Sequence, residues 1–430
     1  YLNASDTSHL HYWFVESESS PETAPVVLWF NGGPGCSSLD GFFYEHGPFE
    51  VESDYKTLSL RPYRWNSIVN MLYIEAPVGV GFSYSDNNDY RCNDDRTATE
   101  NRAAVEAFYA MFPEYKQNKF FITGESYAGV YVPTLAEAIV NGEKDDSYTG
   151  AKLTGIAGTY YEWEYLVQTG FVDTNLKNEI NSECDWEAAA ANEEGALSAK
   201  CVSLLNDASA EIGNVNMYDI YGDCVSSMCA NGDGVVRGKV PARGELFTSS
   251  AESTLVDSDH RRLQRIIPHG PVACIDSAAA SGYLNQPEVM EAIHVRDPGF
   301  CWAVCNTASG WTYKSTRTNL PANTYPLLVS NIDVLVYNGD WDACVPYTDN
   351  EAWTEGMGYS IKKSWHSWAY TSTSGATNQV GGYAVEYDVS GLGDGSFEFI
   401  TVRGGRHEVP ETAPAQAMEM LTRLVNGQVF

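Results

Sequence analysis

The sequence predicts an α/β protein with a mostly parallel central sheet, helices on its faces and a helical, disulfide-tied insertion. The first observation is a set of short apolar runs, which are typical of strands buried on both faces. These runs lie at 25–31, 70–74, 120–123, 334–337 and 397–402. The second is a set of amphipathic helical stretches, at 97–112, 130–139 and 415–425. Strands that alternate with helices indicate a parallel sheet.

The third observation is a change of character between residues 165 and 312. Seven of the ten cysteines lie in this stretch, which has alanine-rich helical segments and no clear alternation of strands and helices. We therefore expect 1–164 and 313–430 to form two parts of one core, with 165–312 inserted as a cap. Arg261-Arg262 follows a polar run and is expected in an exposed, cleavable loop, although the sequence does not decide whether it is cut.

Composition limits the partners and the compartment. The net charge of −31 argues against nucleic acid, because phosphate binding needs clustered Lys and Arg. No apolar run is long enough to cross a membrane, and no leader precedes Tyr1, so we expect a cytosolic or a processed mature protein. The ten cysteines form no zinc-type pairs, and no metal or cofactor is expected. They favour disulfides in an oxidising compartment, and the sequon at Asn3 agrees as a glycosylation site.

The sharpest local motif is the stretch 120–129 (FFITGESYAG). A buried strand runs into Ser126, which small residues flank, and a helix follows. This is the pattern of a nucleophile elbow, in which a tight turn exposes the serine hydroxyl above the sheet. A strand-to-helix turn with an incidental serine is the alternative.

Two later motifs supply partners for this serine. Asp340 and Asp342 follow the strand at 334–337, and His407 follows the strand at 397–402. An α/β-hydrolase fold places its acid and then its histidine after the nucleophile, in this chain order. The imidazole accepts the serine proton and the acid fixes its tautomer. We expect Asp342, further out on the loop, to be the acid, and Asp340 to hold the turn together.

Five segments together resemble the serine carboxypeptidase family, over nearly the whole chain outside the insertion. They are 11–17 (HYWFVES), 31–38 (NGGPGCSS), 76–85 (APVGVGFSYS), the elbow and 283–295. The resemblance implies an α/β-hydrolase fold and a secreted, lysosomal or vacuolar enzyme that removes C-terminal residues from peptides through an acyl-enzyme. The sequence leaves the oligomeric state open, with a homodimer among the alternatives.

The resemblance also assigns binding roles. The backbone N–H groups of Gly33 and Tyr127 would form the oxyanion hole. Asn31, Glu45 and Glu125 would bind the free carboxylate of the substrate. A protonated carboxyl can donate to a carboxylate whereas two ionised groups repel, so we expect tighter peptide binding at acidic pH. Ordinary surface acids are the alternative for the two glutamates.

The cysteine pairing is partly implied. The resemblance implies a disulfide between Cys36 and Cys305. A bridge between Cys184 and Cys201, and one from Cys224 or Cys229 to Cys274, remain open alternatives. Cys344 lies near the expected acid and is a candidate free thiol.

Two departures from the family pattern affect the cleft. Where relatives carry Gly-Asn-Gly, this chain has 158–165 (GTYYEWEY), so Tyr160, Tyr161 and Trp163 either line the cleft or pack against the insertion. Arg406 replaces a small residue before His407 and would act on the imidazole, contact acidic groups or point into solvent.

The leading prediction is a serine carboxypeptidase. An acyltransferase or lyase of the same fold, and a catalytically silent binding or chaperone protein, are the alternatives. Glu125, where acyl-transferring relatives tend to carry Asp, favours the exopeptidase, and the complete set of Ser126, Asp342 and His407 argues against a silent relative.

Overall fold

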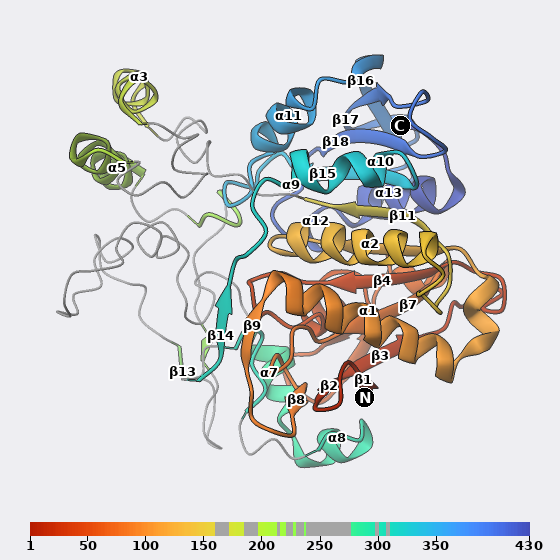
Figure 1. Ribbon diagram of the computed structural model, residues 1–430. Helices are drawn as coiled ribbons and strands as arrows, with labels where there is room; N and C mark the ends of the chain where they lie inside the picture. The colour runs from red at the N-terminus through yellow and green to blue at the C-terminus, as the bar shows by residue number, and fades with distance from the viewer. Residues whose placement is uncertain are drawn as a thin grey trace.

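A nine-stranded mixed sheet forms the centre of the protein (Figure 1). The computed structural model describes residues 1–159, 172–184, 197–212, 216–220, 227–228, 236–237, 277–296, 301–306 and 310–430. In order across the sheet, the strands are β16 (Ser360–Tyr370), β17 (Gln379–Asp388), β18 (Ser396–Val402), β15 (Asp333–Gly339), β11 (Leu153–Gly158), β10 (Phe120–Gly124), β4 (Val26–Phe30), β7 (Asn70–Ile74) and β3 (Tyr12–Val15).

The six strands from β18 to β7 are mutually parallel, which confirms the prediction of a mostly parallel sheet. β3 at one edge, and β16 and β17 at the other, are antiparallel to their neighbours. All five predicted strands are present within a residue or two of the expected bounds. Because the central strands are parallel, the loops that follow them lie at one edge of the sheet, where α/β enzymes place their sites.

Helices cover both faces of the sheet because its buried strands present apolar side chains to each. In β4, Val26, Leu28 and Phe30 belong to one core, while Val27 and Trp29 belong to the other. The first core lies under α1 (Asp94–Met111), α2 (Ala128–Lys144), α9 (Leu320–Asn323), α10 (Tyr325–Val329) and α11 (Tyr347–Gly356). The second lies under α7 (Ala278–Leu284), α8 (Pro287–Ala292), α12 (Val409–Thr412) and α13 (Pro414–Asn426).

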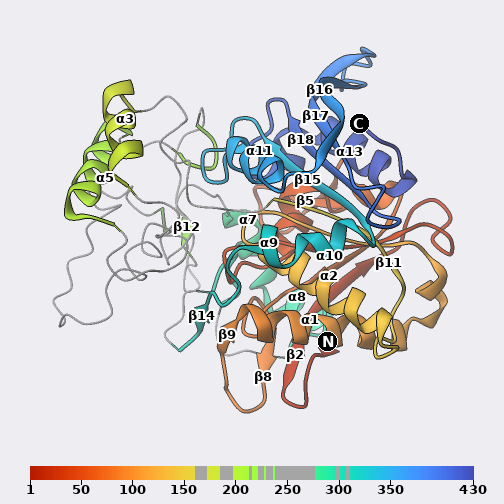
Figure 2. The same cartoon turned by 45° about the horizontal axis from the view of Figure 1, so that its top comes forward.

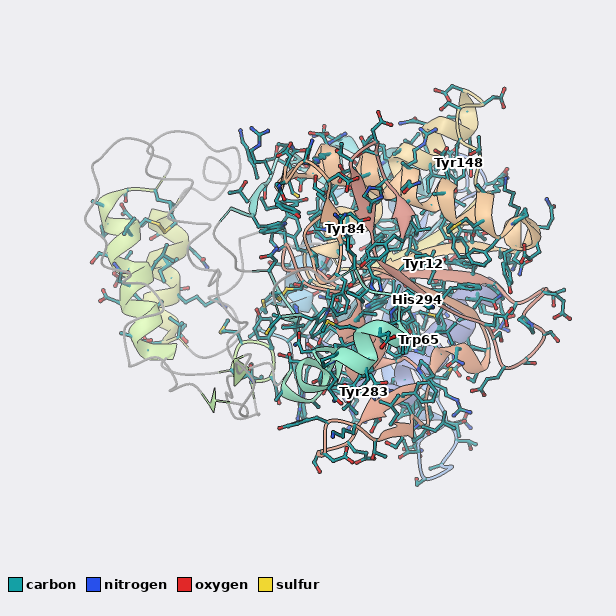
Figure 3. The ribbon with its side chains drawn as sticks, turned by 90° about the horizontal axis from the view of Figure 1, so that it is seen from below. Tyr12, Trp65, Tyr84, Tyr148, Tyr283 and His294 are labelled. Carbon is teal, nitrogen blue, oxygen red and sulfur yellow. A yellow bond between two sulfur atoms is a disulfide. The ribbon has the colours of Figure 1, made fainter. Side chains whose placement is uncertain are left out.

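Short elements complete the core. They are β1 (Leu2–Asn3), β2 (Ser8–Leu10), β5 (Phe49–Val51), β6 (Leu58–Leu60), β8 (Tyr84–Ser85), β9 (Arg91–Asn93), β14 (Thr312–Lys314), the π-helical turn η1 (Gly41–Glu45) and the 3₁₀ turns η2 (Trp65–Ser67) and η3 (Pro113–Gln117). On the underside of the molecule, Tyr283 of α7 and Trp65 both pack into the second core (Figure 3). The Tyr283 ring contacts Phe43 of η1, so α7 packs against an element from the N-terminal part of the chain.

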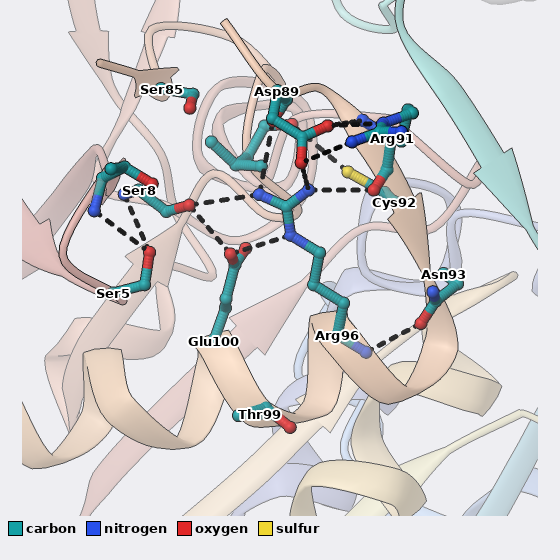
Figure 4. Close-up of polar contacts among 12 residues, drawn as sticks. Ser5, Ser8, Ser85, Asp89, Arg91, Cys92, Asn93, Arg96, Thr99 and Glu100 are labelled. Atoms are coloured by element: carbon teal, nitrogen blue, oxygen red, sulfur yellow. Dashed lines mark hydrogen bonds and ion pairs between the residues drawn. The ribbon is translucent and has the colours of Figure 1, made fainter. Parts of the chain in front are cut away.

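A polar network fixes the start of α1 (Figure 4). Asn93 caps the helix by accepting from the Arg96 backbone N–H at 2.8 Å. The Arg96 guanidinium donates to Glu100 at 2.9 Å and to the Arg91 carbonyl at 2.9 Å, so helix and preceding loop are held together. This position matters because Asp94, the first helical residue, accepts a hydrogen bond from the hydroxyl of Tyr127 beside the predicted nucleophile.

The described part of the predicted insertion includes two helices that lie away from the sheet (Figures 1 and 2). They are α3 (Thr174–Glu183) and α5 (Ala199–Ile212), and a disulfide between Cys184 and Cys201 joins them. The short strands β12 (Ser227–Met228) and β13 (Val236–Arg237) pair with each other. No helix in the described ranges is long and apolar enough to cross a bilayer.

Candidate active site

Ser126 occupies a strained turn between β10 and α2. Its φ of +57° lies in the left-handed region, which is uncommon for a residue with a side chain. The turn is crowded, because a Cβ on Gly124 would lie 2.6 Å from the carbonyl oxygen of Phe30. A glycine is therefore required there, and Ser126 itself stays partly exposed. The local geometry is that of a nucleophile elbow.

His407 and Asp342 meet at the same edge of the sheet. Asp342 follows β15 and His407 follows β18, and the Asp342 Oδ2 lies 2.8 Å from the Nδ1 of His407. Both side chains are buried. The other oxygen of Asp342 accepts backbone hydrogen bonds from Cys344 at 2.8 Å and Val345 at 3.2 Å. An acid that accepts at Nδ1 leaves Nε2 of the imidazole to act as the base.

The nucleophile lies on another loop at this edge of the sheet. The strand that carries Ser126 is two positions from the strand that carries Asp342, with β11 between them. The hydroxyl of Tyr337 in β15 donates to the carbonyl of Gly124 at 3.0 Å, which links the two strand ends directly. Between Ser126 and His407, both in described ranges, no hydrogen bond is formed, and such bonds commonly tighten when substrate binds.

Asp340 has a structural position. Its carboxylate accepts from the backbone N–H of Gly404 at 2.6 Å, and its own N–H donates to the Val402 carbonyl. These bonds join the loop after β15 to the loop after β18. Burial raises the pKa of Asp340, opposed by the hydrogen bond from Gly404. The residue holds the turn, as the sequence predicts, and Asp342 contacts the histidine.

The Asn31–Gly33 turn lies against the nucleophile. A Cβ on Gly32 would lie 2.3 Å from the backbone nitrogen of Tyr127 and 2.8 Å from Cβ of Ser126. Gly33 has a φ of +108°, a conformation that suits glycine. The turn is closed by the Cys36 N–H, which donates to the Gly32 carbonyl at 3.0 Å. The two expected oxyanion-hole residues therefore belong to backbone segments in direct contact.

A disulfide fixes this turn from behind. Cys36 is bonded to Cys305 in the structure, and backbone hydrogen bonds at 2.7 and 2.9 Å flank the bridge on both sides. The implied pairing is therefore present, and so is the alternative that pairs Cys184 with Cys201. Cys344 carries a free thiol, as expected, and burial raises its pKa.

Asn31, Glu45 and Glu125 form one buried hydrogen-bonded group. The Asn31 side-chain nitrogen donates to Glu45 at 3.1 Å and to Glu125 at 3.0 Å. Its oxygen accepts from the Trp29 indole at 2.8 Å and from the Gly41 N–H at 3.0 Å, which fixes the orientation of the amide. The group lies beside Ser126, because Glu125 immediately precedes it in the chain.

The two glutamates hold a proton between them. Burial, followed by the charge of Asp40, raises the pKa of Glu45, and burial, followed by the charge of Glu45, raises that of Glu125. The second oxygen of each carboxyl is buried and has no hydrogen-bond partner among the described residues, so neither carboxyl is stabilised there as a charged group. Two buried carboxyls in contact cannot both ionise cheaply, so at least one proton is retained.

Two further buried acids, Asp40 and Glu408, adjoin this group, and neither was assigned a role from the sequence. Oxygen atoms of Asp40, Glu125 and Glu408 lie within 4.8 Å of one another, and the charge of Glu411 acts on Glu408 from nearby. Burial raises the pKa of Asp40 to about 7, with the charge of Glu411 adding to the rise. Burial, followed by the charge of Asp40, also raises the pKa of Glu408. Oxygen atoms at this spacing suit a divalent cation, but burial and the neighbouring negative charges favour the protonated form of these carboxyls, so we assign protons here.

One piece of the insertion reaches the catalytic loops. Tyr218 lies against His407, and Asp219 forms an ion pair with Arg406 at 2.8 Å. Of the three alternatives for Arg406, the structure therefore gives it an acidic partner. The only sequence signal was the unusual arginine itself, since nothing in the sequence indicated which acid it meets.

Tyr160, Tyr161 and Trp163, the cysteines at 224, 229 and 274, and Arg261-Arg262 lie outside the described residues. Asn3 is exposed at the end of β1, where its side-chain oxygen lies 2.9 Å from Nδ1 of His9.

Comparison with known proteins places the chain in one family. The family model for serine carboxypeptidase matches residues 1–427. The lysosomal protective protein of Mus musculus is 34% identical, over 100% of this chain and 90% of that protein. Serine carboxypeptidase 1 of Hordeum vulgare is 32% identical, over 97% of this chain and 87% of that protein.

A solved structure shows the same fold. Kex1(delta)p, a prohormone-processing carboxypeptidase from Saccharomyces cerevisiae, superposes with a TM-score of 0.69 at 21% identity, over 99% of this chain and 88% of that chain. The predicted α/β-hydrolase fold is thereby confirmed. The chain belongs to the serine carboxypeptidase family, and it is a serine-type exopeptidase.

Proposed function

We propose that Ser126, His407 and Asp342 cleave the last peptide bond of a chain through an acyl-enzyme. The Ser126 hydroxyl attacks the scissile carbonyl while Nε2 of His407 takes its proton. The observation that carries this assignment is the buried hydrogen bond of 2.8 Å between Asp342 and His407, at the sheet edge that also carries the strained Ser126.

The negative charge of the tetrahedral intermediate develops on the carbonyl oxygen. In the proposal, the backbone N–H groups of Gly33 and Tyr127 stabilise it, since their segments meet beside the nucleophile. His407 then gives its proton to the nitrogen of the leaving amino acid, and the bond breaks. Water, deprotonated by the same imidazole, hydrolyses the ester and restores the Ser126 hydroxyl.

The group of Asn31, Glu45 and Glu125 limits the reaction to chain ends. An internal peptide segment has no carboxylate to offer this group, whereas a free C-terminus can accept hydrogen bonds from the amide and from a protonated carboxyl. The support is the burial of these three side chains beside Ser126 and the raised pKa of both carboxyls, which favours a protonated carboxyl that can donate. The substrate is therefore a peptide or protein with a free C-terminal carboxylate.

Blocked dipeptides test this proposal directly. N-acylated dipeptides with a free C-terminus should release their last residue, while the matching C-terminal amides should be cleaved at least about a hundredfold more slowly in kcat/KM. Ser126→Ala serves as the inactive control. Equal cleavage of acids and amides would remove the role of the carboxylate group. Cleavage of neither would favour acyl transfer or binding without turnover.

We also propose that the protein matures in the secretory pathway, as a lysosomal, vacuolar or extracellular enzyme. The support is the pair of disulfides and the exposed Asn3 sequon. Protein secreted from a eukaryotic host should lose mass on endoglycosidase treatment, and Asn3→Gln should not. Free thiols at Cys36 and Cys305 in that material would contradict the proposal.

A further inference from the structure

The segment 216–220 of the insertion lies against both loops that carry the acid and the histidine. The backbone N–H of Ala343, next to Asp342, donates to the Met217 carbonyl at 3.0 Å. The backbone N–H of His407 donates to the Tyr218 carbonyl at 3.1 Å. Two consecutive carbonyls of the insertion thus accept from two loops of the core, so the segment bridges them.

The side chain of Tyr218 restrains the imidazole directly. Its ring meets the ring of His407 edge to face, with centroids 4.8 Å apart and planes at 71°. This is a favourable aromatic geometry, and it blocks rotation of the imidazole toward the insertion. The Tyr218 hydroxyl lies near the thiol of Cys344, and burial raises the pKa of Tyr218, so the ring stays neutral.

An ion pair closes this contact from the other side. The guanidinium of Arg406, the residue before His407, lies 2.8 Å from Oδ2 of Asp219, the residue after Tyr218. The Asp219 side chain is 13% exposed and that of Arg406 is 36% exposed, so the pair is partly shielded from solvent. The Arg406 N–H donates to the hydroxyl of Thr412 at 3.0 Å, which fixes the backbone from which the guanidinium extends.

We propose that Asp219 and Arg406 are positioning residues, which hold segment 216–220 on His407 and thereby orient its imidazole toward Ser126. This inference rests on the proposed role of His407 as the base. The energetic logic is that small displacements of a catalytic group have large effects on rate, while substrate binding depends on other residues. Arg406, which stands where the family pattern has a small residue, then adds an ion pair that the small residue could not form; we call this ion pair the clamp.

A double-mutant cycle separates this role from a general effect on folding. Asp219→Asn and Arg406→Gln should each lower kcat about tenfold with KM within about twofold, and the double variant should be no worse than either single variant, because both remove one interaction. Arg406→Lys, which keeps the charge, should recover part of the rate. Charge reversal is avoided, since an acid at 406 would repel the nearby Glu411.

A second readout does not depend on peptide recognition. The rate at which a small fluorophosphonate labels Ser126 reports the nucleophile and its base alone, and it should fall in parallel with kcat. Lys200→Gln is the matched control, because Lys200 pairs with Glu183 at 3.0 Å within the same insertion, on α3 and α5 away from the catalytic loops. It should leave both rates unchanged.

Salt supplies a third readout. Added salt screens a partly exposed ion pair, so rising ionic strength should lower the labelling rate of the wild type toward that of Arg406→Gln, while the variant stays nearly constant. Unchanged kcat and labelling rates in both single variants would overturn the proposal, and so would additive losses in the double variant. If peptides are not cleaved but labelling shows the predicted cycle, the clamp stands and the assigned substrate fails.

Discussion

Replacing Glu125 with Gln should remove most of the pH dependence of peptide binding. In the wild type, burial and the charge of Glu45 raise the pKa of Glu125 well above its usual range, which favours its protonated form. A glutamine has nearly the same shape and donates its N–H at every pH. The change therefore replaces a donor that is lost on ionisation by one that is permanent.

The size of the effect follows from the competition between repulsion and proton uptake. Two unit charges about 4 Å apart repel by about 4 kcal/mol at an effective dielectric constant of about 20. Keeping a proton on a carboxyl costs only about 1.4 kcal/mol for each pH unit above its pKa. For about three pH units above the pKa, taking up a proton costs less than the repulsion, so the pair should bind a proton together with the peptide. Because that proton becomes scarcer as the pH rises, KM should rise about tenfold per pH unit over this range.

Steady-state kinetics with one blocked dipeptide from about pH 4.5 to about pH 8.5 measure this slope. Glu125→Gln should have a KM within about threefold of the wild type at the acidic end and at least about tenfold below it at the alkaline end. Glu398→Gln is a matched control. Burial also raises the pKa of Glu398, to about 7, but this residue lies near the start of β18, and the site lies beyond the other end of that strand. A wild-type KM that stays flat over this range would refute the reasoning, as would an unchanged slope in Glu125→Gln.

Three further outcomes are expected. Asp342→Asn should lower kcat about 10³- to 10⁴-fold without changing the melting temperature by more than a few degrees, because the amide N–H would face Nδ1 of His407 and favour the wrong tautomer. Gly32→Ala should lower kcat/KM at least about a hundredfold, because its Cβ would lie 2.3 Å from the nitrogen of Tyr127 and displace the turn. Asp40, with its pKa raised from 3.8 to about 7, should cost the folded state about 4 kcal/mol as the pH rises from about 4 to about 7. Melting curves at the two pH values should therefore differ less in Asp40→Asn than in the wild type; an equal difference would contradict this.

The central sheet could be predicted because the buried strands are visible in the sequence as continuous runs of apolar residues. β4, β7 and β10 are buried at every position and appear as continuous apolar runs. The hairpin of β16 and β17 escaped prediction for the opposite reason. β16 is exposed along most of its length and includes Lys362 and Lys363, so it has neither a continuous run nor a clean alternation. Its pairing with the sheet is a tertiary property.

Part of the candidate site could be predicted from the sequence in the same way. Ser126, Asp342 and His407 follow buried strands, which the apolar runs mark, so their common edge could be inferred. No sequence pattern of this kind shows which acidic residues will be buried. Asp40 is an ordinary acid in the sequence, and only the fold brings it next to Glu125, where burial raises its pKa.

The bond between Cys36 and Cys305 has a consequence for how the molecule tolerates proteolysis. It joins positions 269 residues apart, on opposite sides of nearly the whole insertion. A single cut anywhere between them yields two polypeptides. If the cut falls in the insertion, Ser126 lies on the first polypeptide and His407 on the second. Both would remain covalently attached, and the shared sheet would hold nucleophile and base in register. Such a nicked form should migrate as one species until it is reduced, so a two-chain enzyme could circulate as a single molecule.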